Sequence, residues 1–300
     1  RHLRHRGGDT APVTSPATSP TTGHPYLDRV LDRPGTVLAL AHRGGAFHPE
    51  IEGLENTVAA FEHAVALGYG YLETDVHLTR DGVLLAFHDS VLDRVTDRSG
   101  AILDLTLAQV REASVGGREQ VPTLAELFER FPHARFNIDI KSEGAVAALA
   151  DFVSAHDAWE RVLVGSFSPR RLATFRRLTG GRVPTSAHPW EVLAFRLLPS
   201  ARLARALTGG RVAALQVPHR RRLPLAGGRS VRVVTPGLVR RAHAAGAHVH
   251  VWTIDEPEEM RHLLELGVDG LFTDRTDVLR DVLRARGQWE EARDEPRNEH

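Results

Sequence analysis

From residue 36 onward, short apolar runs of strand length alternate with longer segments in which apolar residues recur every three or four positions. The short runs are typical of buried strands, and the longer segments are typical of amphipathic helices. Strands are predicted at residues 37–41, 72–76, 136–140, 162–166, 182–186, 213–217, 248–252 and 270–273, and helices at residues 122–131, 145–155, 169–178, 236–245, 257–266 and 276–285.

Eight strands that alternate with helices over roughly 250 residues are the number expected of a (β/α)8 TIM barrel, an α/β fold with one parallel sheet. A doubly wound open sheet is the second choice, because it rarely needs eight such units. No glycine-rich nucleotide-binding loop of either common type occurs in the sequence. We therefore predict a barrel whose functional site lies at the carboxyl ends of its strands.

Two segments are longer than the connections that a minimal (β/α)8 barrel needs. Residues 89–121 are too long for an ordinary strand-to-helix loop and predict a small insertion after the second barrel strand, over the barrel mouth. Residues 188–212 are basic and apolar, and they are predicted to form an outer-ring helix that packs on its strand. The alternative is a helix that lies on a membrane surface. Its lipid-facing side chains would be Trp190, Leu193, Phe195 and Leu197.

The chain is predicted to hold one catalytic domain between two unstructured ends. Residues 1–24 are basic and then rich in Thr, Ser and Pro, which predicts a disordered tail. Residues 25–286 hold the predicted barrel. Residues 287–300 are charged and are predicted to fray.

Composition narrows the classes of partner and cofactor. The 38 basic and 38 acidic residues balance, so a nucleic-acid partner is not expected, because binding to a phosphate backbone needs a positive surplus. Cysteine is absent from the sequence, which excludes disulfides and thiolate–metal sites. Neither an apolar run of the ~18 residues typical of a membrane span nor a signal-peptide pattern is visible. A cytoplasmic protein without a transmembrane segment, with at most peripheral membrane contact, is predicted.

Lysine and asparagine are rare in this chain. Lys141 is the only lysine among the 38 basic residues, and asparagine occurs only at positions 56, 137 and 298. Lys141 and Asn137 lie in one predicted strand, and either chance or a chemical need that arginine and aspartate do not meet accounts for them. The second explanation marks this strand as part of the functional site.

The first predicted strand runs into an unusual turn. It ends at His42-Arg43-Gly44-Gly45, and a helix follows for which Asn56 is the predicted N-cap. A polar, glycine-rich turn at the end of a buried strand is a position at which barrel enzymes carry functional residues.

The second predicted strand carries acidic side chains on one face. Glu73, Asp75 and His77 alternate with apolar residues, so the two carboxylates lie on the same side, roughly 6.5–7 Å apart along the chain. A third apolar run, at residues 83–87, ends at His88 and Asp89. Histidines and carboxylates at strand ends together suggest a site for a metal ion and a phosphate.

These motifs follow the order found in a known family. HRG is followed by ENT, by E-x-D in a strand, by T-x-D-G and by HD. The order continues through VPTL, NIDIK, SFS, VWT, GVDG and TD, over about residues 36–285. On these motifs the chain resembles the glycerophosphodiester phosphodiesterase family. The resemblance implies a metal-dependent (β/α)8 barrel that cleaves glycerophosphodiesters into glycerol 3-phosphate and an alcohol.

Three acidic residues are the predicted metal ligands. Glu73, Asp75 and Asp139 are expected to face inward at the barrel mouth, where ionised carboxylates repel one another and need a cation. Oxygen donors without cysteine suit one divalent cation, Mg²⁺ or Ca²⁺. The alternative is an acidic cluster neutralised by arginine in buried ion pairs. The resembled family commonly has Glu where Asp139 stands, and Leu54 replaces its usual Pro before ENT.

His42 and His88 are the predicted acid–base pair. The leaving alkoxide of a phosphodiester is a strong base, and imidazole, with an unperturbed pKa of ~6.5, exchanges protons near neutrality. Among 17 histidines, these two stand at the mouth ends of apolar strands. His77, His248 and His250 are expected to be structural.

Four further side chains are predicted to bind substrate. Arg43 and Lys141 are placed to bind non-bridging phosphate oxygens. Phe167 and Trp252, at strand ends, are predicted to wall the pocket, with core packing as a near-equal alternative. Glu55 is expected to orient the turn after the first strand, to reach the metal or to support the helix cap.

The sequence therefore predicts a metal-dependent phosphodiesterase that acts on a small-molecule glycerophosphodiester by His/His acid–base catalysis. The nucleophile is either water or a neighbouring hydroxyl of the substrate, which would give a cyclic phosphate. One alternative is a lysophospholipase D-like lipid phosphodiesterase with the same residues and an apolar rim. An alternative of a different class is a catalytically silent barrel that binds a phosphate ligand.

Overall fold

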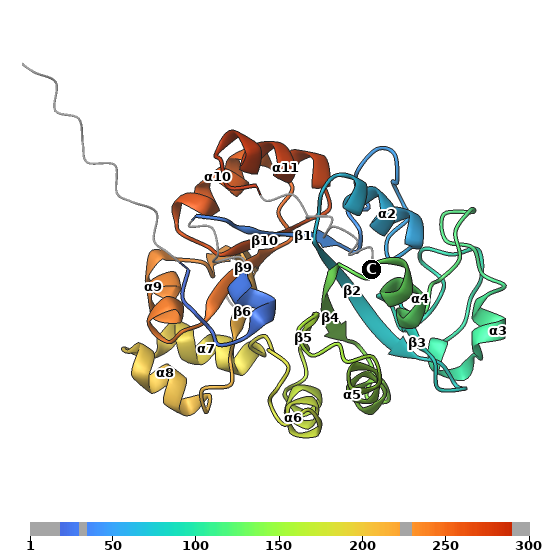
Figure 1. Ribbon diagram of the computed structural model, residues 1–300, viewed down its shortest axis with the longest axis horizontal. Coiled ribbons are helices and arrows are strands. Elements are labelled where there is room, and N and C mark those ends of the chain that lie inside the picture. Colours follow the sequence, from blue (N-terminus) through green and yellow to red (C-terminus); the bar gives the residue numbers. More distant parts are fainter. Residues whose placement is uncertain (1–18, 30–34, 223–229, 290–300) are drawn as a thin grey trace, which may run out of the picture.

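The computed structural model describes residues 19–29, 35–222 and 230–289 (Figure 1). At its centre a curved parallel sheet has the strand order β5-β4-β2-β1-β10-β9-β6. These strands are β1 (Leu38–His42), β2 (Tyr71–Leu78), β4 (Arg135–Ile140), β5 (Val162–Gly165), β6 (Ala214–Pro218), β9 (His248–Trp252) and β10 (Gly270–Thr273).

Residues 185–186 close the sheet between β5 and β6. They form two parallel bridges, one with Val164 and the other with Ala214. Pro184, which has no N–H to donate, stands just before them and shortens this strand. The strand predicted at residues 182–186 is therefore reduced to two residues, and the eight predicted strand positions form a (β/α)8 barrel.

Helices surround the sheet (Figure 1). Side-chain caps define where several of them begin. At α4, for example, Thr123 accepts the N–H of Glu126, whose carboxylate accepts the N–H of Thr123 in return. The outer helices are α2 (Val58–Ala66), α4 (Leu124–Arg130), α5 (Ala145–Ala155), α6 (Pro169–Leu178), α7 (Pro189–Leu197), α8 (Ala201–Leu207), α9 (Pro236–Ala244), α10 (Pro257–Glu265) and α11 (Thr276–Ala285).

The predicted cap of α2 is wrong. Thr57, not Asn56, is the N-cap residue, and its side chain accepts the N–H of Ala60. Asn56 has a φ of 58°, and its buried side chain donates to Asp75 and accepts from Thr74. Asn56 therefore fixes the acidic strand β2 rather than the start of the helix.

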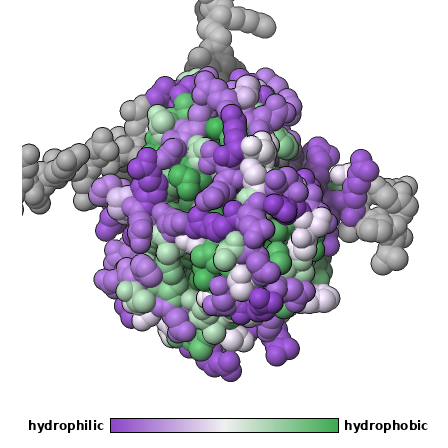
Figure 2. Space-filling model, turned by 90° about the vertical axis from the view of Figure 1, so that its right-hand side faces the viewer, coloured by the Kyte–Doolittle hydropathy of each residue, from purple (hydrophilic) through white to green (hydrophobic). Residues whose placement is uncertain are grey.

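The insertion follows β3 (Leu84–Ala86), which pairs antiparallel with β2 and is not a barrel strand. It contains the short helices η2 (Ile102–Asp104) and α3 (Leu107–Val110) around a small core of its own. It lies beside β2 and β3 in Figure 1, and hydrophilic residues predominate on this side of the molecule (Figure 2). Because no residue of 89–121 lines the cavity described below, the insertion borders the mouth rather than covering it.

The short helix α1 (Pro25–Asp28) closes the opposite end of the barrel. Tyr26 and Leu27 are fully buried against residues from the amino-terminal parts of the strands. The hydroxyl of Tyr71 donates to the main-chain oxygen of Tyr26 at 2.8 Å. This plug leaves the carboxyl ends of the strands as the open end of the barrel.

Both predicted tails are described only in part. Of residues 1–24, the structure describes 19–24, where the main-chain oxygen of Pro20 lies 3.0 Å from Nε2 of His248. Of residues 287–300, it describes 287–289, where Trp289 packs edge-on against Tyr69. The other residues of each tail lie outside the described ranges.

Residues 188–212 form two helices, α7 and α8, rather than one. Phe195 is buried, as expected of an outer-ring helix, whereas Trp190 and Leu197 are 70% and 67% exposed. Within the described ranges, no helix combines the length and the hydropathy needed to cross a membrane.

Candidate active site

All nine predicted site residues line one cavity of about 310 Å³ at the carboxyl ends of the strands. The structure thus brings together side chains as distant in sequence as positions 42 and 252. They are the histidines His42 and His88, the carboxylates Glu73, Asp75 and Asp139, the cations Arg43 and Lys141, and the aromatic residues Phe167 and Trp252.

The register of β2 and β4 explains why three acidic side chains meet. Asp75 stands opposite Asp139, and Glu73 stands opposite Asn137. Because alternate residues of a strand share a face, these side chains point into the barrel together. Glu73 and Asp75 are only 5% and 2% exposed.

Two cations contact this acidic group. Nζ of Lys141 lies 3.0 Å from Asp75 and 2.6 Å from Asp139. Nε of Arg43 lies 3.3 Å from Asp75, while its main-chain N–H donates to Glu73 at 3.0 Å. Two cations do not neutralise three carboxylates. The alternative, in which buried ion pairs neutralise the whole acidic cluster, therefore holds only in part.

The pKa values of these three carboxyl groups reflect how much positive charge lies near each of them. Burial and the neighbouring Asp75 raise the pKa of Glu73 to about 7. Burial also raises the pKa of Asp139 above its usual value, and its Oδ1 has no hydrogen-bond partner among the described residues. Burial opposes ionisation of Asp75 too, but Lys141 and Arg43 outweigh it and lower the pKa of Asp75. An all-oxygen donor set that lacks positive charge fits a hard divalent cation.

The carboxylate of Asp274, the residue that directly follows the last barrel strand, holds His42. Nδ1 of His42 lies 2.9 Å from Oδ1 of Asp274, and Nε2 lies 3.9 Å from Glu73. The main-chain N–H of Asp274 donates to Asp255 at 2.8 Å, which steadies this end of β10. Burial lowers the pKa of His42, but the Glu73 and Asp274 carboxylates together raise it above the ordinary value. The ring is thus oriented with Nε2 on the side of the acidic cluster.

His88 has a carboxylate partner of its own. Its Nδ1 lies 2.6 Å from Asp89, and Arg94 contacts both Asp89 and Glu55 at 2.6 Å. The hydrogen bond from Arg94 lowers the pKa of Asp89 to about 2, so this carboxylate stays charged. Glu55 also lies 3.3 Å from Arg43. Of the three roles considered for Glu55, these contacts match the orienting one.

The turn after β1 requires its two glycines. Gly44 and Gly45 have φ values of 88° and 87°. A Cβ on Gly44 would lie 2.6 Å from that of Ala60, and one on Gly45 would lie 2.5 Å from Thr276. Only glycine fits both the conformation and the space. The turn thereby presents Arg43, itself at a φ of 49°, next to the acidic cluster.

The rest of the cavity is mainly apolar, although Gln216 and the cation Arg221 also line it. Phe167 is 61% exposed and packs edge-to-face against Trp252, with ring centroids 6.0 Å apart. Nζ of Lys141 lies 5.9 Å from the centre of the Phe167 ring, where the charged and apolar parts meet. The apolar lining also includes Pro189, Val192, Val217, Pro218, Val233 and Phe272. The cavity therefore joins a charged end to an apolar end.

The three weaker histidine candidates do not line the cavity. His77 Nε2 lies 3.0 Å from the main-chain oxygen of His88, and His248 contacts Pro20. Burial lowers the pKa of His250 to about 3, which keeps it neutral inside the barrel. These contacts are of the structural kind expected for all three.

Sequence reasoning missed the roles of Asp274 and Arg94. Asp274 directly follows the last predicted strand, and that position signals a residue at the barrel mouth. Arg94 lies in the insertion, where neither periodicity nor a motif marks it.

Comparisons with known proteins agree with this geometry. The sequence profile of the Glycerophosphoryl diester phosphodiesterase family matches residues 42–278. A relative from Mycobacterium tuberculosis, named probable glycerophosphodiester phosphodiesterase 2, is 42% identical over 264 residues, which cover 87% of this chain and 96% of the relative. Human lysophospholipase D GDPD1 is 28% identical over 272 residues, which cover 81% of this chain and 85% of the relative.

Solved structures give the same result. A phosphodiesterase from Oleispira antarctica, in complex with the product sn-glycerol-3-phosphate, has a TM-score of 0.66 to this protein at 25% identity. The match covers 82% of this chain and 96% of that one. The chain belongs to the glycerophosphoryl diester phosphodiesterase family, a family of phosphoric diester hydrolases.

Proposed function

We propose that the protein hydrolyses glycerophosphodiesters to glycerol 3-phosphate and an alcohol. The observation that carries the proposal is that each cavity histidine has its own carboxylate: Asp274 for His42 and Asp89 for His88. A carboxylate on Nδ1 fixes the ring and leaves Nε2 to exchange a proton with the substrate. Two such groups suit a phosphodiester, because one proton leaves the nucleophile and another reaches the departing alkoxide.

The two histidines divide the proton transfers between them. One takes the proton of the attacking hydroxyl, and the other protonates the alcohol as its bond to phosphorus breaks; each role is typically worth roughly 10²–10⁴ in rate. The attacking oxygen belongs to water or to the neighbouring hydroxyl of the glycerol moiety. Phosphorus NMR of the reaction separates these routes, since only the second passes through a cyclic phosphate.

Arg43 and Lys141 are the proposed ligands of the non-bridging phosphate oxygens. Both are anchored at the cavity by the acidic cluster, Arg43 through Asp75 and Lys141 through Asp75 and Asp139. A guanidinium and an ammonium at one edge of the cavity offer the charge-assisted hydrogen bonds that a phosphate accepts.

Glu73, Asp75 and Asp139 are the proposed ligands of one divalent cation, Mg²⁺ or Ca²⁺. The excess of buried carboxylates over cations and the unpartnered oxygen of Asp139 support this proposal. When bound, the cation would offset the negative charge that the phosphate brings and polarise it toward attack.

A lysophospholipase D-like activity is the second candidate. The apolar side of the cavity favours it, because Phe167 and Trp252 offer more apolar surface than a small polar headgroup needs. The human relative is named a lysophospholipase D. The same histidines and carboxylates would serve, with the acyl chain of a lysophospholipid lying along the apolar side.

The proposed catalytic unit is the single domain of residues 25–286. α1 plugs one end of the barrel and α11 ends at Ala285, so these residues include every barrel element in the described ranges. A chain trimmed to these residues is expected to retain its activity.

The test is release of glycerol 3-phosphate from glycerophosphocholine and of lysophosphatidic acid from lysophosphatidylcholine, for the wild type, His88→Ala and His133→Ala. His133 is exposed and remote from the cavity, so it controls for loss of a histidine. Loss of turnover in His88→Ala alone supports the proposal, and faster turnover of the lysolipid assigns the second candidate. Binding of glycerol 3-phosphate without turnover of either substrate would identify a silent binding barrel instead.

A further inference from the structure

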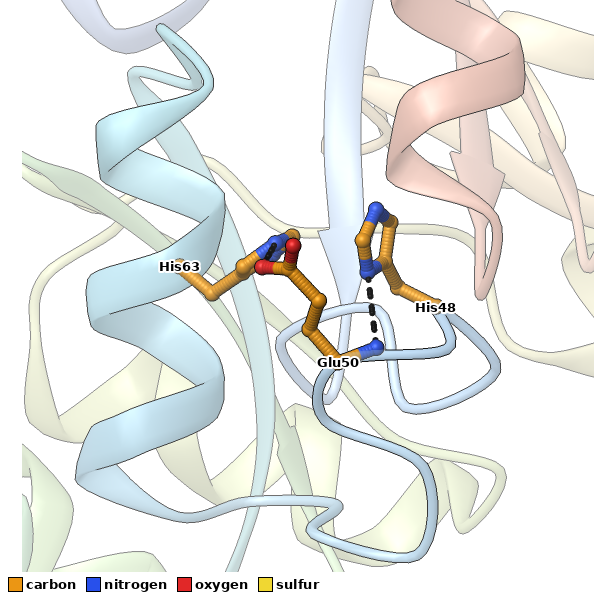
Figure 3. Close-up of side chains that lie close together, drawn as sticks. All are labelled: His48, Glu50 and His63. Carbon is orange, nitrogen blue, oxygen red and sulfur yellow. Dashed lines mark hydrogen bonds and ion pairs between the residues drawn. The ribbon is translucent and has the colours of Figure 1, made fainter.

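Within the described ranges, one group has the donor spacing of a metal site, and it lies outside the catalytic cavity; Glu73, Asp75 and Asp139 do not meet that spacing. His48, Glu50 and His63 each offer a donor atom, and the three atoms lie within 4.8 Å of one another (Figure 3). His48 and Glu50 stand in the loop between β1 and α2, and His63 is on α2. None of the three lines the catalytic cavity.

The side chains are already turned toward one another. Nε2 of His63 lies 3.1 Å from a carboxylate oxygen of Glu50, and the rings of His48 and His63 have centroids 4.1 Å apart. Nδ1 of His48 accepts the main-chain N–H of Glu50 at 3.2 Å, so this nitrogen carries its lone pair on the Glu50 side (Figure 3). A cation bound there would replace the hydrogen bond between His48 and the main chain of Glu50 and the ion pair between His63 and Glu50.

The group combines a largely buried donor residue, His63, with a solvent-exposed one, Glu50. The His63 side chain is 14% exposed, and its Nδ1 is buried without a hydrogen-bond partner in the described part of the chain. The Glu50 side chain is 74% exposed and free to move inward. Zinc bonds of about 2.0–2.1 Å place tetrahedral ligands roughly 3.4 Å apart, so donors that lie within 4.8 Å of one another need to close by at most about 1.4 Å.

We propose that His48, Glu50 and His63 bind a borderline divalent cation of the Zn²⁺ class. Two imidazole nitrogens and one carboxylate oxygen prefer such a cation over Mg²⁺ or Ca²⁺, which suit the all-oxygen set of the cavity. The cation takes the place of the proton on Nε2 of His63: in the neutral imidazole that proton moves to Nδ1, and in the imidazolium it is released to solvent.

Occupancy would clamp the loop that precedes α2 onto that helix. The same loop is tied to the catalytic side of the barrel, because the main-chain N–H of Phe47 donates to the main-chain oxygen of Asp274 at 3.1 Å. Asp274 in turn holds His42. The site is thus a structural clamp next to a catalytic residue, and it stands independently of the proposed reaction.

Calorimetric titration with Zn²⁺ tests the proposal; it is run in saturating Mg²⁺ and again in saturating Ca²⁺, so that the proposed cation of the cavity is present in one of the two runs. The variants are His48→Ala and Glu50→Gln, and the matched controls are His133→Ala and Glu265→Gln, both exposed and outside the group. We expect the wild type and both controls to bind one Zn²⁺ equivalent. His48→Ala should weaken that binding by more than the roughly 10–100-fold that loss of a supporting partner costs.

Glu73→Ala, which removes a proposed cation ligand of the cavity, separates this site from the catalytic cavity. It should keep the Zn²⁺ equivalent, and Zn²⁺ should raise the melting temperature of Glu73→Ala but not of His48→Ala. Unchanged Zn²⁺ affinity in both His48→Ala and Glu50→Gln overturns the proposal, and so does loss of the Zn²⁺ equivalent in Glu73→Ala alone.

Discussion

The carboxylate of Asp274 lies 2.9 Å from Nδ1 of His42, although 232 positions separate the two residues. The contact follows from the way the barrel closes. β1 pairs in parallel with β10, and Ala41 stands opposite Thr273. The next residue along each strand is therefore His42 on one side and Asp274 on the other, both at the mouth.

Replacing Asp274 by Asn should lower kcat by about 10²-fold or more, because a general acid or base in the wrong orientation loses most of its contribution. The neighbouring carboxylate also helps to raise the pKa of His42, so the limb of the pH–rate profile that reports His42 should move to lower pH. Steady-state kinetics across pH measure both effects. Asp277→Asn, which removes a carboxylate that pairs with Arg275, is the control, and an Asp274→Asn enzyme with wild-type kcat and pH profile would contradict the role.

Replacing Arg94 by Ala should lower kcat about tenfold through its effect on His88. Arg94 links the carboxylate partner of His88 to Glu55, and its hydrogen bond lowers the pKa of Asp89 to about 2. Without it, Asp89 is free to turn away from the imidazole. Arg98→Ala, at an exposed position of the same insertion, should leave kcat unchanged, and equal effects of the two substitutions would count against a link to His88.

Most barrel strands could be predicted from the sequence, and so could nine of the residues that line the cavity, because apolar runs mark buried strands and functional groups gather at their carboxyl ends. One exception is local: Pro184 lacks an N–H and shortens its strand to two residues. The others arise from contacts beyond the local pattern, because Asn56 bonds across to β2 instead of capping a helix, and the partner of His42 comes from the other end of the sequence. The last of these pairings depends on barrel closure, which local patterns do not encode.

Replacing Phe167 by Ala should distinguish the two candidate substrates. The ring forms part of the apolar side of the cavity, so its loss should raise KM for lysophosphatidylcholine roughly fivefold, in line with about 1 kcal/mol of lost apolar contact. KM for glycerophosphocholine should change little. Kinetics with Trp190→Ala, an exposed aromatic residue outside the cavity lining, provide the control. Equal changes of KM for both substrates would show that Phe167 does not contact an acyl chain.

Replacing Asp269 by Asn should lower the free energy of unfolding by about 1.5–3 kcal/mol near neutral pH, because this buried carboxylate accepts charge-assisted hydrogen bonds. It accepts from His243 at 2.8 Å and from the main-chain N–H of Val249 at 2.7 Å. Burial would raise the pKa of Asp269, but the hydrogen bond from His243 and the nearby His248 lower it below the ordinary value.

The sign of the pH dependence follows from that lowered pKa. The stabilising effect of Asp269 is fully present above the unfolded pKa of about 3.9 and is lost as the pH falls toward the folded value. Urea unfolding of wild type and Asp269→Asn should therefore differ most near neutrality and converge in acid. Asp151→Asn, at an exposed site, is the control, and a difference that grows in acid would contradict the assignment.

The most direct test of metal-dependent catalysis by two histidines is the rate of glycerol 3-phosphate release from glycerophosphocholine after EDTA treatment and after adding back Mg²⁺ or Ca²⁺. The wild type is compared with His42→Ala, His88→Ala and Glu73→Ala. The account predicts no turnover in EDTA, recovery with one of the two cations in the wild type, and no recovery in any of the three variants. Full turnover in EDTA, or wild-type recovery in His42→Ala and His88→Ala, would contradict it.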